Sequence, residues 1–216
     1  MQCSMTPLEL SNYIERLTRL HFPDENAFDL KPSCIDKALS RIEYCHSHIK
    51  LKYFKDENGP IFDHLHGDHM AAFLWFLSNT VYLDNPDNKT AFKLSYLNKI
   101  LHGLDLYCTV SMPDVFLLVH PVGTVLGNAS YGDFLVVYQG CTIGSNGLEY
   151  PKIGRHNIFY SNSSLIGASS TGRNVVFGAN SSIINTSIVS DSLVVGSYPS
   201  NRIIPRSGLQ TQHIFV

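Results

Sequence analysis

The second half of the chain carries apolar or nearly apolar residues at every sixth position. The clearest run has eight members: Ile153, Phe159, Leu165, Thr171, Phe177, Ile183, Val189 and Val195. A period of six fits neither an α-helix nor the alternation of a hairpin strand. It is typical of a parallel β-helix, in which each short strand points one apolar side chain inward before the chain turns a corner. The pattern therefore predicts a core in which each coil covers the apolar face of the next.

The repeat is interrupted once, between Ile143 and Ile153, where the spacing is ten residues instead of six. Four extra residues must leave the coil, so we expect a loop to project within residues 145–152. Solenoids often place functional residues in such loops.

The first half of the chain holds most of the charges and has helical spacing of apolar residues. It predicts helices over residues 7–21, 33–48, 66–81 and 91–104. The turn-forming run at residues 84–88 separates the last two. We expect an α+β protein, with a helical domain over residues 1–110 and a β-helix over residues 111–216.

Composition narrows the class of protein. The chain has 216 residues, 44% of them hydrophobic, and a net charge of −2. This balance gives no argument for nucleic acid or for a membrane surface as a partner. The five cysteines form no C-x-x-C pair, so we interpret them as reduced thiols of a cytoplasmic protein.

Three segments resemble motifs of one enzyme family. Residues 120–127 (H-P-V-G-T-V-L-G) resemble its H-A-T-G-I-V-I-G motif. Residues 139–144 (Q-G-C-T-I-G) and 150–153 (Y-P-K-I) resemble its Q-G-V-T-L-G and H-P-K-I motifs. Over about residues 112–200 the chain thus resembles the serine acetyltransferase branch of the hexapeptide-repeat acyltransferases. The resemblance implies a left-handed β-helix, a homotrimer with active sites between subunits, acetyl-CoA as donor, and no metal.

His120 is the candidate catalytic residue, because it occupies the position of the family's catalytic histidine. A hydroxyl acceptor needs a base to take its proton, and a neutral imidazole suits this task near pH 7. Such a base needs a partner on its other ring nitrogen. Asp114 is the nearest upstream carboxylate and Asp105 is a further candidate. The alternative is a purely structural histidine at a β-helix corner.

Four positions depart from the family's acceptor site: Val119, Asn128, Glu149 and Tyr150 stand where it has two acids, an arginine and a histidine. Losing the arginine removes the natural fork for a carboxylate. We therefore favour a hydroxyl or amine of a sugar-like acceptor, in surface polysaccharide synthesis, over the alternative, serine in cysteine biosynthesis.

The candidate acceptor-binding residues lie in the projecting loop and in a histidine-rich run. Glu149 and Tyr150 end the projecting loop, and Asp68 and His69 lie in the run at residues 63–69. We expect all four to contact the acceptor. The alternatives are an exposed loop, a helix cap at Asp68, and a metal site in the run.

Positions for coenzyme A also follow from the resemblance: Gly144, Ser145, Ser161, Ala179 and Arg202. The first four are small and would let backbone groups approach the pantetheine arm, whereas Arg202 would meet a phosphate. Small residues also recur in the repeat for structural reasons. A zinc lyase of the carbonic anhydrase kind, with His120 and His156 as ligands, is the last alternative.

Overall fold

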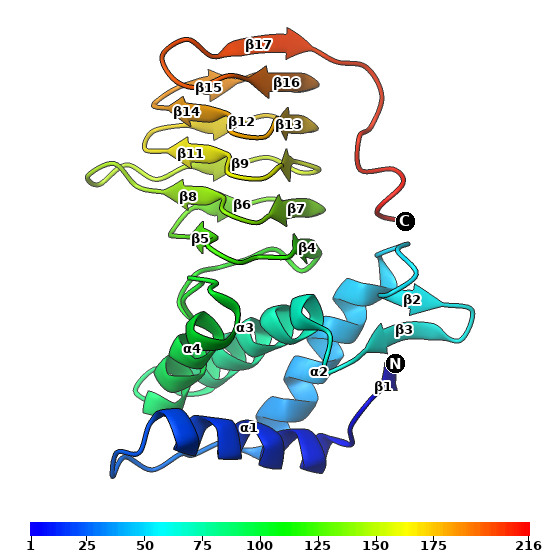
Figure 1. The fold of residues 1–216 in the computed structure, drawn as a ribbon, viewed down its shortest axis with the longest axis vertical. Helices are drawn as coiled ribbons and strands as arrows, with labels where there is room; N and C mark the ends of the chain where they lie inside the picture. The colour runs from blue at the N-terminus through cyan, green and yellow to red at the C-terminus, as the bar shows by residue number, and fades with distance from the viewer.

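The computed structural model describes residues 1–216 and begins with a helical region below a stack of coils (Figure 1). Its helices are α1 (Pro7–His21), α2 (Pro32–Ser47), α3 (Gly67–Asp84) and α4 (Lys89–His102). A small sheet accompanies them, in the order β1 (Gln2–Cys3), β3 (Gly59–Phe62), β2 (Lys55–Asp56). The four predicted helices are all present, and their ends are displaced by at most three residues.

Local signals in the sequence fix the ends of these helices. Thr6 and Glu9 form a capping box at the start of α1. The Asn88 side chain accepts the Thr90 N–H at the start of α4, and Gly103 ends that helix with φ of 63°. Each interaction satisfies backbone groups that the helix leaves without a partner.

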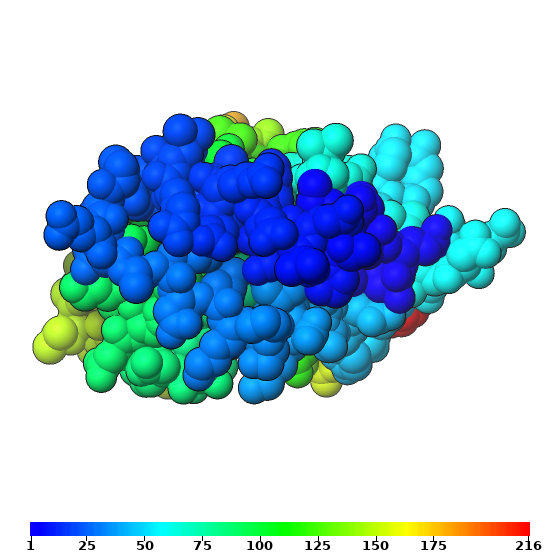
Figure 2. Space-filling view, turned by 90° about the horizontal axis from the view of Figure 1, so that it is seen from below, coloured from blue at the N-terminus to red at the C-terminus, as the bar shows by residue number.

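Helix α3 is the centre of the helical region and supports the first coil. Its residues are buried from His69 to Val81. Trp75 and Phe76 both contact Phe116, which begins the first strand of the coils, at ring-centroid distances of 5.5 and 5.4 Å. Figure 2 shows α1 spread across the end of the molecule that faces away from the coils. None of the four helices combines the length and the apolar character that crossing a bilayer would need.

The second region is the predicted left-handed parallel β-helix, whose coils contribute strands to three sheets. The first sheet contains β4 (Phe116–Val119), β7 (Leu135–Tyr138), β10 (Ile158–Phe159), β13 (Val175–Phe177) and β16 (Ser192–Val195). The second contains β5 (Val125–Leu126), β8 (Thr142–Gly144), β11 (Ser164–Ile166) and β14 (Ser182–Ile184). The third contains β6 (Ser130–Tyr131), β9 (Lys152–Ile153), β12 (Ser170–Thr171) and β15 (Ser187–Ile188).

The register of the strands confirms the projecting loop. Ile158 pairs with Val176, 18 residues later, as three hexapeptides require. Val136, however, pairs with Ile158, 22 residues later. The four additional residues form a hairpin between β8 and β9, closed by two backbone hydrogen bonds between Asn146 and Glu149.

The core stacks like residues, but the period of six ends before residue 189. Phe159 lies on Phe177 with ring centroids 4.3 Å apart. The next coil is one residue shorter, so Thr171 pairs with Ile188 and Phe177 pairs with Val194. Val189 is 73% exposed, and the prediction that it points inward was therefore wrong. The shorter coil has the same effect at Val195, which is half-exposed, whereas its neighbour Val194 is buried in the core.

Two features finish the fold at its C-terminal end. Strand β17 (Arg202–Pro205) pairs antiparallel with β16 and covers the last coil. The chain then returns along the coils to the helical region (Figure 1). There the Lys50 N–H donates to the Ile214 carbonyl, the Val216 N–H donates to the His48 carbonyl, and Phe215 is buried against Phe134. The tail thus connects the two regions.

Candidate functional site

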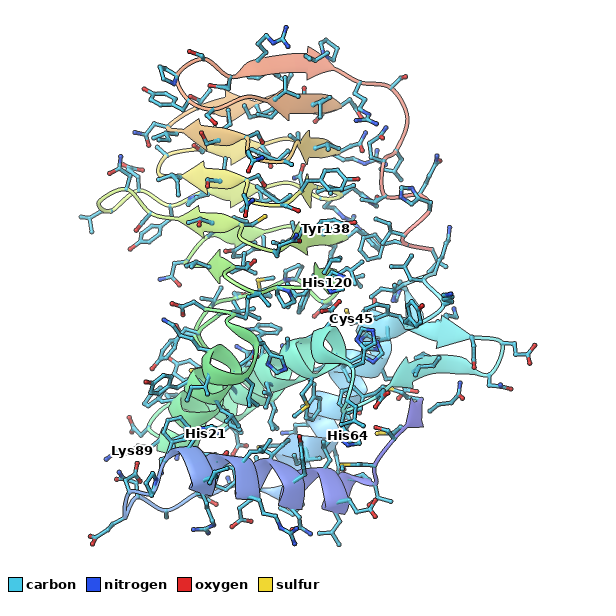
Figure 3. All side chains as sticks on the ribbon, viewed as in Figure 1. His21, Cys45, His64, Lys89, His120 and Tyr138 are labelled. Atoms are coloured by element: carbon cyan, nitrogen blue, oxygen red, sulfur yellow. The ribbon has the colours of Figure 1, made fainter.

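His120 stands at the corner that follows β4, with its side chain 78% exposed (Figure 3). Its backbone lies in the left-handed region, with φ of 47°. Seven other non-glycine residues of the coils share this conformation, so it is a general feature of the coil corners. The His120 carbonyl accepts a hydrogen bond from the Val122 N–H, which stabilises the corner. The exposed imidazole therefore projects from a defined backbone.

Asp68 is the carboxylate that contacts His120. It lies in the first turn of α3 with a side chain only 12% exposed. Its Oδ1 accepts the His120 backbone N–H at 3.0 Å, and its Oδ2 lies 3.8 Å from the ring Nδ1. A carboxylate on this side of an imidazole favours the tautomer with the proton on Nδ1 and leaves Nε2 free as a base.

A second histidine, His102, lies near the same carboxylate at the end of α4. Its Nδ1 is 2.9 Å from the Asn98 side-chain oxygen. Burial lowers the pKa of His102, and Asn98 and the negative charge of Asp68 act against that shift. His102 belongs to no motif, so sequence analysis did not identify it.

Asp114, expected as the partner of His120, lies elsewhere. The two residues are at opposite ends of β4, so about 20 Å of extended chain separates them. Asp114 borders a hollow with Arg41 and Tyr44. The expected carboxylate therefore comes from a helix, which motif spacing could not show.

Asp105, the other carboxylate considered, lies beside β5. Its backbone bridges to Val125, and its side chain forms an ion pair with Lys99 at 2.6 Å. It borders a hollow of about 280 Å³ that Gly127 and Asn128 also line. This hollow lies on the coil that begins with His120.

His69, which we expected to contact the acceptor, is buried in the helical region. It is 1% exposed, and its Nδ1 accepts the Asp63 N–H at 3.1 Å. Its ring stacks on His66, with centroids 4.1 Å apart, and also contacts Phe54. Burial, followed by the neighbouring His46 and His66, lowers the pKa of His69 to about 3. His69 is a neutral core residue, and its neighbours form no metal-binding cluster.

Glu149 and Tyr150 are exposed residues of the hairpin. In the view of Figure 3 the hairpin projects from one side of the coils, whereas His120 lies toward the other side. A single chain therefore does not bring these two residues to His120.

Two of the expected coenzyme A positions lie on the edge that His120 begins. Backbone hydrogen bonds connect the corners of this edge from one coil to the next. The N–H groups of Gly140, Asn162 and Asn180 donate to the carbonyls of Val122, Gln139 and Ser161, respectively. Ser161 and Ala179 therefore stand above His120 in one column. Gly144 and Ser145 lie at the end of β8 and the start of the hairpin, and Arg202 is exposed on β17.

Sequence reasoning missed the tyrosines of this edge. Tyr138 pairs with Val119 next to His120, and Tyr160 lies above it with ring centroids 5.0 Å apart. Burial raises the pKa of Tyr138, with a further contribution from Tyr160. The Oε1 of Gln139, the residue that follows Tyr138, is buried without a hydrogen-bond partner. These groups offer an aromatic surface and an unused acceptor beside the candidate base.

His156, the second ligand in the zinc lyase alternative, has a structural environment. Its Nδ1 forms a 2.8 Å hydrogen bond with Thr211, and its ring stacks on Phe134. It belongs to the contact between the tail and the coils.

Comparisons with known proteins address the resemblance directly. No protein-family model matches the chain. A serine acetyltransferase from Synechococcus elongatus is 30% identical over 78 residues, which are 36% of this chain and 31% of that relative. The match thus spans about a third of the relative's length.

The solved structures extend the likeness to the whole architecture. Serine acetyltransferase from Neisseria gonorrhoeae has a TM-score of 0.67 and 21% identity, over 84% of this chain and 73% of that one. The fold is that of serine acetyltransferases. A serine acetyltransferase in complex with CoA has a TM-score of 0.61 and 16% identity, over 91% of this chain and 76% of that one. The predicted architecture, helices followed by a hexapeptide β-helix, is confirmed.

Proposed function

We propose that the protein is an acetyl-CoA-dependent O-acetyltransferase of the serine acetyltransferase type. The observation that carries this proposal is the exposed His120, held by Asp68 on the serine acetyltransferase fold. The likeness to the Synechococcus enzyme and the motif around His120 support the same assignment.

His120 would act as the general base through Nε2. As the acceptor hydroxyl attacks the thioester carbonyl of acetyl-CoA, its proton passes to Nε2. The tetrahedral intermediate then collapses, the carbon–sulfur bond breaks, and the departing thiolate takes the proton back from the imidazolium. Asp68 would be a positioning residue, because its charge stabilises the imidazolium and its hydrogen bond to the backbone N–H holds the corner that carries the ring.

Coenzyme A would lie along the coils, and a structural neighbour has been solved in complex with CoA. The half-exposed Ser161 and exposed Ala179 present small side chains in the column above His120. Gly144 and Ser145 would meet it at the start of the hairpin. Arg202 is free of ion pairs and could meet a phosphate.

Serine is the acceptor that the comparisons favour over the sugar-like acceptor we first preferred. Val119 replaces the family's acid next to the base, but Asp68 brings a carboxylate to the same histidine from α3. Asp68 would thus supply the negative charge beside the base that the acid at position 119 supplies in the family. Glu149 and Tyr150 still support a polyhydroxylated acceptor as the second candidate, because they can hydrogen-bond sugar hydroxyls but cannot form a fork for a carboxylate.

We propose a homotrimer in the cytoplasm, with each site completed by a neighbouring chain. The hairpin and His120 lie apart in one chain (Figure 3). Val122 and Val125 on the corner and strand after His120 are 66% and 38% exposed, which suits burial between subunits. The five cysteines are all free thiols, as in a reducing compartment.

Release of CoA thiol from acetyl-CoA, measured with serine and with a panel of amino sugars, tests the proposal. We expect turnover with serine, and a loss of about 10² to 10⁴-fold in His120→Ala. Turnover with an amino sugar alone would restore the second candidate. Equal activity of His120→Ala would remove this histidine from the mechanism.

A further inference from the structure

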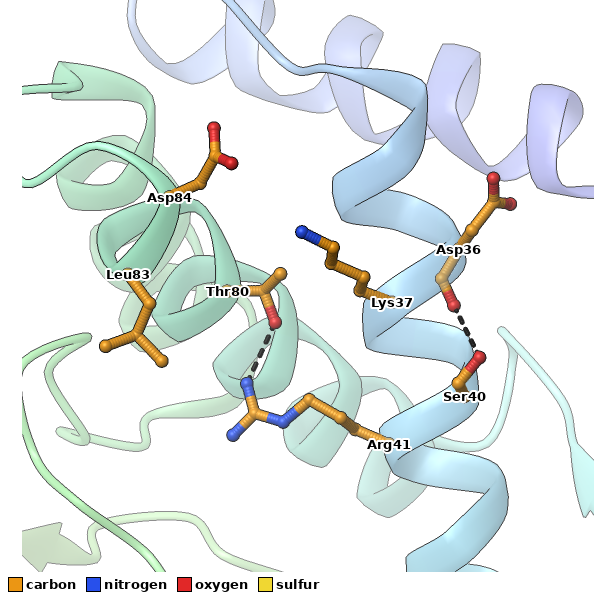
Figure 4. Close-up of a pocket in the computed structure, with 7 residues that line it drawn as sticks. All are labelled: Asp36, Lys37, Ser40, Arg41, Thr80, Leu83 and Asp84. Carbon is orange, nitrogen blue, oxygen red and sulfur yellow. Dashed lines mark hydrogen bonds between the residues drawn. The ribbon is translucent and has the colours of Figure 1, made fainter.

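A wide groove lies between α2 and α3, away from His120. It encloses about 770 Å³ and is bounded by Lys37 and Arg41 on one side and by Thr80 and Leu83 on the other (Figure 4). A second hollow of about 340 Å³ shares Arg41 and extends to Asp114. Arg41 therefore stands where the two hollows meet.

The Arg41 guanidinium is fixed in this position. Its Nη1 donates to the Thr80 hydroxyl at 2.8 Å and to the Phe76 carbonyl at 3.3 Å. Its Cζ lies 4.9 Å from the centre of the Phe76 ring and 5.3 Å from that of Trp75. A guanidinium carries five N–H donors, and both of these bonds use Nη1. The donors on Nε and Nη2 have no acceptor in the protein.

The positive charge of Arg41 is also without an ion-pair partner. Asp84 lines the same groove, but it pairs with Lys31 at 2.7 Å. Lys37 precedes Arg41 by one helical turn, and like charges at this spacing destabilise a helix unless an anion lies between them. Burial lowers the pKa of Arg41, and the more distant Asp114 only partly opposes this. Of the carboxylates that line the groove, Asp36 alone lacks a cationic partner, and it is exposed.

We propose that this groove binds a small metabolite through an oxyanion group, either a carboxylate or a phosphate. The free edge of Arg41 would bind two oxygens of the group side by side, and Lys37 would provide the second cation. Leu83, which is 68% exposed, offers apolar surface to the rest of the metabolite. The volume falls in the range of small-molecule sites.

This site is separate from the candidate active site. Asp68, which contacts His120, begins α3, and Thr80 and Asp84 lie near its other end. Sixteen helical residues place the two ends about 24 Å apart. Binding in the groove can therefore be measured independently of acetyl transfer, and its outcome does not depend on the function proposed above.

Trp75 provides the measurement, because it is the only tryptophan and the Arg41 guanidinium lies over its ring. We would titrate the full-length protein with inorganic phosphate and, separately, with succinate at constant ionic strength. We expect a saturable change in Trp75 fluorescence with at least one of them. Phosphate alone or succinate alone would identify the preferred oxyanion.

Two variants and one control make the test specific. Arg41→Gln should weaken binding by at least about 10-fold, since it removes the charged donors. Lys37→Gln, on an exposed side chain that folding does not need, should weaken binding by a few-fold. Arg16→Gln, an exposed arginine on α1, should leave the affinity unchanged. The proposal would be overturned if neither phosphate nor succinate bound saturably. It would also be overturned if Lys37→Gln and Arg41→Gln both folded and bound with the affinity of the wild type.

Discussion

Asp68 and His120 are 52 residues apart in the chain, yet Asp68 Oδ1 accepts the His120 backbone N–H at 3.0 Å. One residue belongs to the first turn of a helix and the other to a corner of the coils. The candidate base is therefore positioned by the helical region, and the contact between the two regions forms part of the site.

Asp68→Asn should separate charge from structure at this contact. The amide oxygen can still accept the His120 N–H, but it carries no negative charge toward Nδ1. We expect kcat to fall by about 10- to 100-fold, with the KM for acetyl-CoA and the unfolding midpoint nearly unchanged. Steady-state kinetics and thermal unfolding measure both. A fall in the midpoint without a fall in kcat would assign Asp68 a purely structural role.

Two inactive variants should complement each other if sites lie between subunits. One variant is His120→Ala, and the other lacks residues 146–149, which would reduce the 22-residue coil to the regular 18. After joint refolding at equal amounts, about a quarter of the sites would combine an intact histidine with an intact neighbouring hairpin. We expect about that fraction of wild-type activity. Activity no higher than that of the separate variants would contradict the arrangement.

The buried histidines should make the protein sensitive to acid. Burial lowers the pKa of His46 to about 4 and that of His69 to about 3, both from 6.5. As the pH falls, the unfolded chain takes up protons on these histidines before the folded protein does. Their contribution to the free energy of unfolding is therefore fully present above pH 6.5 and decreases as the pH falls toward 4. His46 alone would contribute a loss of roughly 2–4 kcal/mol.

Urea unfolding at several pH values would measure this dependence. His46→Gln should flatten it, because glutamine does not titrate, whereas the exposed His213→Gln should not. An equal pH dependence in wild type and His46→Gln would show that other groups cause the loss.

The C-terminal tail should stabilise the contact between the two regions. Phe215 is 3% exposed and packs against Phe134, so Phe215→Ala should lower the free energy of unfolding by about 3 kcal/mol. Val216, 62% exposed, provides the control, and Val216→Ala should have little effect. Equal unfolding midpoints for the two variants would mean that the tail is only loosely attached.

The sequence predicted the coils better than the site, for physical reasons. The hexapeptide pattern is local, because each inward position recurs at a fixed interval, and the insertion after Ile143 was visible as a change of that interval. The contact of Asp68 with His120 depends on how a helix packs under a coil, which no spacing reveals. His69 shows the converse, since its polar neighbours in sequence suggested a site, whereas tertiary packing buried its ring among aromatic side chains.

The reversal of direction at β17 bears on how these molecules behave at high concentration. A stack of parallel coils ends in a strand whose free N–H and C=O groups could pair with another chain, so such stacks tend to grow into fibres. β17 runs antiparallel over that strand, and Pro205 on it has no N–H to offer. The edge of β16 is thereby closed to a strand from another molecule, which should limit end-to-end aggregation through this sheet.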